Sequence, residues 1–100
     1  LYELVLYGLK GMAAYLHHAA VLGVEDDDVC PFVHEALDFL AREDRSADEL
    51  LAMALRLGAV NIKALEMLDK ANTGAYGHLV STKVRITPVA GKAILISGHD

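Results

Sequence analysis

Cysteine and tryptophan are nearly missing from this sequence, which has one Cys and no Trp in 100 residues. A single thiol, Cys30, excludes an internal disulfide framework and is typical of a protein from a reducing compartment. A secretory signal is also missing, because no basic region precedes a short apolar core and a cleavage site. We therefore predict a cytoplasmic protein.

Basic residues are also few in this sequence. The chain has 9 Lys and Arg against 14 Asp and Glu, a formal net charge of −5. The basic residues are scattered and form no patch that would attract phosphates, so no nucleic-acid partner is predicted. The uncharged stretch Gly11–Val24 has about 14 residues and contains two histidines, which is too short and too polar to span a bilayer. No membrane partner is predicted.

Apolar residues, at 54%, are abundant enough for one small core. They recur every three or four residues from Leu1 to about Leu22, which predicts a first helix capped by Gly23. An acidic run, Glu25–Asp28, predicts the start of a second helix, with Asp27 or Asp28 accepting the free backbone N–H groups. Pro31 is compatible only with the first turn of that helix.

A third helix is predicted from Ala47 to Asn72. Ser46 and Glu49 form a capping-box pattern at its start, and Asn72–Gly74 is typical of a left-handed end. Asn61 falls on the apolar side, so it is expected to hydrogen-bond across helices. The residues expected to be mutually buried are Leu16, Phe32, Leu37, Leu57, Ala64 and Leu68.

The pattern changes after Gly74. Lys83–Thr87 is typical of a short β segment, and Pro88–Gly91 of a turn. The apolar run Ala93–Ile96 then predicts a strand buried on both faces, as in a parallel sheet. The predicted fold is mainly α: a three-helix bundle (residues 1–73), followed by a linker and the first buried strand of an α/β, Rossmann-like domain (residues 74–100). Both chain ends suggest a segment of a larger protein.

One candidate site residue follows the predicted strand, in the sequence Ser97-Gly98-His99-Asp100. Ligands of open α/β sheets bind beyond the carboxyl ends of the strands. His99 there is a candidate metal ligand, acid or base, or phosphate contact. The alternative is a histidine that only hydrogen-bonds to the following loop.

Other groups are better explained by structure. His17 and His18 are adjacent, so on a helix they point about 100° apart and do not form a metal pair. The acidic run lacks calcium-loop spacing. His34 and Asp38, four residues apart, predict a surface pair. No dinucleotide, Walker, zinc-protease or serine-hydrolase motif is present.

Three stretches, Tyr7–Tyr15, Leu68–Gly77 and Ala93–Asp100, resemble the hybrid cluster protein family, also called prismane proteins or hydroxylamine reductases. The resemblance covers nearly the whole chain in the right order. It implies a helical bundle that leads into an α/β domain holding an iron–sulfur–oxygen hybrid cluster. Val80 departs from the family, in which many members have proline at this position.

By this resemblance His99 is a ligand to one iron of the hybrid cluster. The parent enzyme would carry a second iron–sulfur cluster, receive electrons from a donor protein, and reduce a small nitrogen-oxide substrate, hydroxylamine or nitric oxide. The family's other ligands, cysteines and glutamates, have no counterpart in this chain, and Cys30 matches none of them. Because a soft cluster needs several thiolates, the isolated segment is expected to be inactive and to hold no cofactor.

Two alternatives remain at this point. A nickel–iron carbon monoxide dehydrogenase relative would share the architecture and a Gly-His turn, although Ser97–Asp100 favours the hybrid cluster family. A helical interaction module without a metal is the non-enzymatic alternative.

Overall fold

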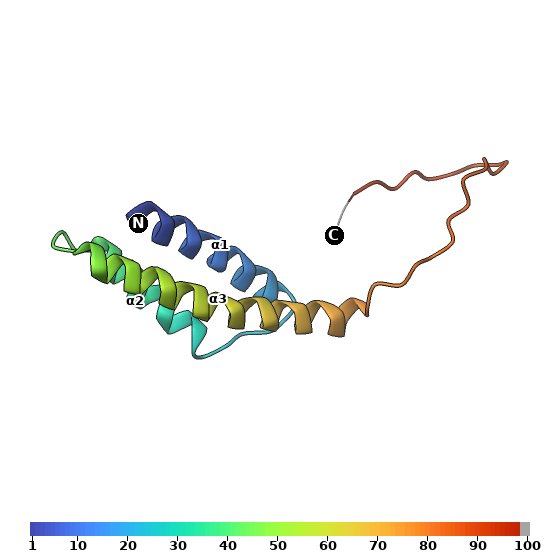
Figure 1. Ribbon diagram of the computed structural model, residues 1–100. Helices are drawn as coiled ribbons and strands as arrows, with labels where there is room; N and C mark the ends of the chain where they lie inside the picture. The colour runs from blue at the N-terminus through green and yellow to red at the C-terminus, as the bar shows by residue number, and fades with distance from the viewer. Residues whose placement is uncertain (99–100) are drawn as a thin grey trace.

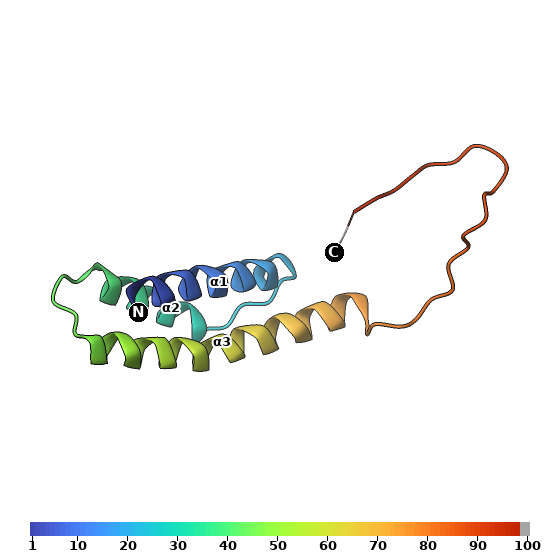
Figure 2. The ribbon, with the colours of Figure 1, turned by 45° about the horizontal axis from the view of Figure 1, so that its top comes forward.

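The protein is represented by a computed structural model that describes residues 1–98. Its regular structure consists of three helices, α1 (Tyr2–Val21), α2 (Val29–Ala41) and α3 (Ala47–Tyr76). Helices α1 and α3 run in the same direction and pack against each other, and α2 runs in the opposite direction (Figures 1 and 2). The prediction of a mainly α fold with three helices is confirmed.

The end of α1 has the cap that the sequence predicted. Gly23 takes a left-handed conformation with φ of 79°. Its N–H donates to the carbonyl of Ala20 at 2.9 Å, and the N–H of Val24 donates to the carbonyl of Ala19 at 3.0 Å. This pair of hydrogen bonds is the Schellman motif, which satisfies carbonyls that the helix leaves free.

The start of α2 differs from the prediction in its capping residue. The carboxylate of Asp26 accepts from the N–H groups of Asp28 at 2.7 Å and Val29 at 3.0 Å. Asp28 is the N-cap residue, but its side chain makes no capping hydrogen bond. The reason is its helical backbone (φ −92°, ψ −33°), whereas a capping side chain normally needs an extended one.

Helix α3 starts as predicted and ends later. The Glu49 N–H donates to Ser46 Oγ at 3.2 Å, and the Ser46 N–H donates to Glu49 Oε2 at 2.8 Å, which completes the capping box. The predicted stop at Asn72–Gly74 is wrong, because the helix continues to Tyr76. The glycine with a positive φ is Gly77, at φ 80° and ψ −179°, and its N–H donates to the carbonyl of Thr73 at 2.8 Å.

The core lies where the three helices meet. Three residues of the predicted core, Phe32, Leu57 and Ala64, are buried, and Leu16 and Leu68 are half-buried. Leu37 was wrongly predicted, since it is 49% exposed and Phe39 is buried in its place. These two residues border the apolar face of α2 on opposite sides, so the rotation of α2 against its neighbours decides which one enters the core. The buried residues are Val5, Leu9, Met12, Ala19, Val29, Phe32, Ala36, Phe39, Leu40, Met53, Leu57 and Ala64.

From Gly77 the chain leaves the bundle as an extended segment (Figure 1). Neither predicted strand, 83–87 or 93–96, forms within residues 1–98. Ile94, Leu95 and Ile96 are 91%, 93% and 89% exposed. A strand needs a hydrogen-bonded neighbour, and no second strand lies beside this segment in the described part of the chain.

Among the helices of residues 1–98, none is both long enough and apolar enough to cross a membrane.

Candidate functional site

The predicted metal ligand, His99, lies outside the residues that the structure describes. The segment that leads to it, residues 93–98, is exposed.

Other potential metal ligands in residues 1–98 are dispersed. The rings of His17 and His18 have centroids 6.0 Å apart and planes inclined by 55°, and both residues are exposed on α1. Cys30 is exposed at the start of α2. Across residues 1–98, no three His, Cys, Asp or Glu side chains come together in a way that could hold a metal ion. These residues do not fit a cluster site by themselves.

The acidic run before α2 has a structural role. The Asp26 carboxylate accepts two backbone N–H groups, so it caps the helix. Carboxylates near a helix N-terminus are also favoured by the helix dipole.

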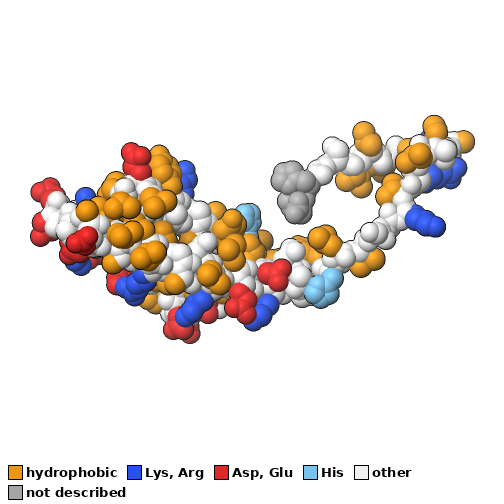
Figure 3. Space-filling view, in the orientation of Figure 1, with side chains coloured by type: hydrophobic (Ala, Val, Ile, Leu, Met, Phe, Trp, Pro, Cys, Tyr) orange, Lys and Arg blue, Asp and Glu red, His pale blue; other side chains and the backbone are white. Residues whose placement is uncertain are grey.

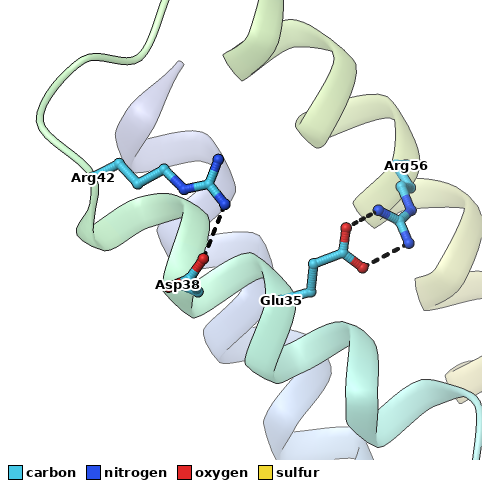
Figure 4. A network of polar contacts seen from close by, with 4 residues as sticks. All are labelled: Glu35, Asp38, Arg42 and Arg56. Carbon is cyan, nitrogen blue, oxygen red and sulfur yellow. Dashed lines mark hydrogen bonds and ion pairs between the residues drawn. The ribbon is translucent and has the colours of Figure 1, made fainter.

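Two ion pairs, drawn in Figure 4, organise the surface of α2. Glu35 on α2 pairs with Arg56 on α3 through both guanidinium Nη atoms, with Nη2 to Oε2 at 2.8 Å. Arg56 also lies over the ring of Phe32, 5.0 Å from its centroid. The hydrogen bond from Arg56 lowers the pKa of Glu35 below its usual value of 4.5. This pair joins α2 to α3.

The predicted pair of His34 with Asp38 is wrong. Asp38 accepts instead from Nη2 of Arg42 at 3.0 Å, one helical turn further along α2 (Figure 4). Arginine reaches further and is always charged, so it is the stronger partner for the carboxylate.

Asn61 also departs from the prediction. Its Oδ1 atom is buried, yet it accepts no hydrogen bond from any residue of the described chain. A buried carbonyl oxygen without a donor destabilises the fold by about 1–3 kcal/mol. Asn61 thus faces the apolar side, as expected, without the predicted bridge between helices.

An open depression of about 530 Å³ lies between the end of α1 and the second half of α3. The sequence did not predict this depression, because it is formed by two helix segments that are far apart in the chain, the end of α1 and the second half of α3. Its lining residues are His18, Val21, Leu22, Leu65, Leu68, Asp69, Asn72 and Tyr76.

Comparison with known proteins decides the family. The model of the Prismane/CO dehydrogenase family matches residues 1–100. The chain belongs to the Prismane/CO dehydrogenase family. The resemblance to hybrid cluster proteins drawn from the sequence is therefore confirmed.

Several similar proteins are named hydroxylamine reductase. The protein from Burkholderia lata is 57% identical over 97% of this chain, and the one from Maridesulfovibrio salexigens is 51% identical over 98%. The protein from Rhodospirillum rubrum is 53% identical over 100% of this chain. In each case the chain covers 18% of the relative, so it spans less than a fifth of these proteins.

Proposed function

We propose that this chain is part of an oxidoreductase that reduces hydroxylamine to ammonia and water. The observation that carries the proposal is 50–58% identity over nearly the whole chain to proteins named hydroxylamine reductase. The reaction breaks the N–O bond and consumes two electrons and two protons per hydroxylamine. Nitric oxide is the alternative substrate.

The proposed cofactor is an iron–sulfur–oxygen hybrid cluster, with His99 as a ligand to one of its irons. Imidazole is a suitable ligand for iron, and its second ring nitrogen can donate a hydrogen bond to its surroundings that fixes the orientation of the ring. Since residues 1–98 contain no group of three donor side chains, the other ligands would come from parts of the protein outside this chain. A second iron–sulfur cluster and an electron donor protein would supply the electrons.

The proposed division of the chain gives each part a role. The helical bundle, which extends to Tyr76 at the end of α3, would shield the cluster-binding domain from bulk water. The chain after Gly77 would lead into the α/β domain, with 93–96 as a strand that pairs with segments outside this chain. The high exposure of Ile94, Leu95 and Ile96 supports this, because three adjacent apolar side chains favour burial in a sheet.

A second candidate applies to the 100 residues in isolation: a helical module without metal or activity. The dispersed donor side chains of residues 1–98 favour it. A carbon monoxide dehydrogenase-like activity of the whole protein is the remaining alternative, and the family description includes such enzymes.

The test is His99→Ala in the full-length protein, with His78→Ala as control, because His78 is an exposed histidine that follows α3. We expect His99→Ala to lose most hydroxylamine turnover and to change the hybrid-cluster EPR signal, while the other cluster keeps its signal. His78→Ala should match the unaltered protein in activity, iron content and spectrum.

Full activity and an unchanged spectrum in His99→Ala would refute the assignment of this residue. Oxidation of carbon monoxide without turnover of hydroxylamine would favour the alternative enzyme. The isolated 100-residue chain, after reconstitution with iron and sulfide, should bind less than one iron per chain.

A further inference from the structure

The chain leaves α3 through a glycine with an uncommon backbone conformation. Gly77 has φ of 80° and ψ of −179°. A left-handed residue that ends a helix would have ψ of about +47°, so Gly77 is not a left-handed cap. Its angles fall in a region that essentially only glycine occupies, because the Cβ of an L-residue is disfavoured there.

A lack of space does not explain this glycine. A Cβ at Gly77 would meet nothing within 4 Å. Gly8 is different, because a Cβ there would lie 2.7 Å from Cδ2 of Leu57. At Gly77 the need for glycine therefore comes from the backbone angles and not from a neighbouring group.

Gly74 offers a comparison three residues earlier on the same helix. Gly74 and Gly77 are both exposed, and a Cβ at either one would meet nothing within 4 Å. They differ in backbone conformation, because the φ of Gly74 is not positive. Alanine should therefore fit the backbone at position 74 and not at position 77.

The last turn of α3 holds the peptide group that precedes Gly77. The Gly77 N–H donates to the carbonyl of Thr73 at 2.8 Å. The hydroxyl of Thr73 donates in turn to the carbonyl of Asp69 at 2.8 Å. Because a peptide group is planar, the N–Cα bond of Gly77 is the first bond whose rotation can turn the chain away from the helix.

The φ of Gly77 sets the direction of the segment that follows, residues 78–98. An L-residue would favour a negative φ, for example about −80°, which rotates the rest of the chain by about 160° around the N–Cα bond. Three extended residues reach about 10 Å, so Val80 would move by about 5 Å or more.

The helices do not guide this segment within residues 1–98. Figure 3 shows it apart from the packed helices. Its side-chain hydrogen bonds are internal, from Thr82 Oγ1 to the carbonyl of Val80 and from Arg85 Nε to Thr87 Oγ1. The junction at Gly77 is therefore the place where its direction is decided.

We propose that Gly77 is a positioning residue, which sets the direction in which the chain runs from the helical bundle toward His99. The inference rests on the proposed function, in which His99 is a ligand of the cluster. Gly77 acts through the placement of residues 78–98 and not by binding. Glycine is the residue type that takes these backbone angles without steric cost.

Distances measured by pulsed EPR on the 100-residue chain test this inference without any activity. Nitroxide labels are attached at Lys63→Cys on α3 and at Val80→Cys, in a Cys30→Ser background, and all three positions are exposed. Position 77 carries glycine, L-alanine or D-alanine, introduced by chemical ligation of synthetic segments. D-Alanine favours φ of about 80° with ψ of about 180°, the mirror image of the extended region of L-residues.

We expect the chains with glycine and D-alanine to share one distance distribution, and the chain with L-alanine to have a mean shifted by about 5 Å or more. Gly74→Ala is the control and should leave the distribution unchanged. One distribution for all three residues at position 77 would overturn the inference. So would a D-alanine chain that resembles the L-alanine chain.

Variants of the full-length protein test the consequence for the site. Gly77→Ala should lower kcat for hydroxylamine by about tenfold or more and change the hybrid-cluster EPR signal, while the other cluster keeps its signal. Gly77→Asn should do the same, because asparagine tolerates the left-handed region but not the angles of Gly77. Gly74→Ala should match the unaltered protein.

An unchanged EPR signal and full activity in both Gly77 variants would refute the positioning role. A melting temperature of the 100-residue chain that Gly77→Ala lowers by more than about 5 °C would also refute it, because the loss would then come from the bundle. If the full-length protein does not turn over hydroxylamine, the proposed function fails, and the distances measured in the 100-residue chain still decide the inference.

Discussion

Leu57 is the best position at which to test the packing of α1 on α3. It is 5% exposed, and its Cδ2 lies 2.7 Å from the place where a Cβ of Gly8 would be. The leucine therefore fills the space that the glycine leaves open. Leu57→Ala removes this filling from the contact between the two helices.

We expect Leu57→Ala to lower the free energy of unfolding by an amount in the upper part of the range that is usual for such truncations. Truncation of a buried leucine to alanine costs about 2–5 kcal/mol, and the cost grows with the cavity that remains. Gly8 has no side chain that can move into the cavity, so we expect about 3–5 kcal/mol. Small domains are stable by about 5–15 kcal/mol, so this change removes a large part of the total.

The assay is urea unfolding of the 100-residue chain, followed by circular dichroism at 222 nm. Leu55→Ala is the matched control, because Leu55 lies two residues away on the same helix and is 69% exposed. It should change the free energy of unfolding by less than about 0.5 kcal/mol.

A double variant tests the reason for the cost. Gly8→Ala in the Leu57→Ala background places a methyl group in the vacated space and should recover about 1 kcal/mol, from burial and from helix propensity. In the unaltered chain Gly8→Ala should stabilise less, because its methyl would displace Leu57. If Leu57→Ala and Leu55→Ala unfold at the same urea concentration, the phasing of α3 is wrong.

Two further predictions concern polar contacts. Ser46→Ala removes the hydroxyl that accepts a hydrogen bond from the Glu49 N–H. This change should lower the free energy of unfolding by about 1 kcal/mol in the same urea assay, whereas the control Ala47→Ser should not lower it. Glu35→Gln tests the pair with Arg56, whose hydrogen bond lowers the pKa of Glu35 below 4.5 in the folded protein. A lowered pKa means that the stabilisation is present above pH 4.5 and is lost as the pH falls through the folded-state value. The urea midpoints of the two proteins should therefore differ at pH 7 and converge as the pH falls below 4.5 and through the lowered folded-state pKa of Glu35, and a constant difference would refute the role of the charge.

Local signals in the sequence were sufficient for several features. The capping box of Ser46 and Glu49 and the glycine cap at Gly23 act between residues a few positions apart, so they could be predicted correctly. The buried state of Leu57 followed from helical periodicity. Resemblance of short motifs was sufficient for the family.

Competing local signals were harder to rank. Asn72–Gly74 carries the residue types of a helix end, but the helix continues to Tyr76 and ends at Gly77, which has the positive φ. Asp26, Asp27 and Asp28 have the same side chain, and only the backbone angles of the turn decide which carboxylate caps α2.

The sequence by itself determined the three helices, most of the core and the family, because these depend on periodicity, neighbouring residues and motif identity. Only the tertiary structure decided that Phe39 and not Leu37 is buried, that Asp38 pairs with Arg42, and that Oδ1 of Asn61 has no donor among residues 1–98. The physical reason is that each of these depends on how the helices are rotated and placed against one another. That arrangement is a property of all three packed surfaces together, and no single stretch of sequence encodes it.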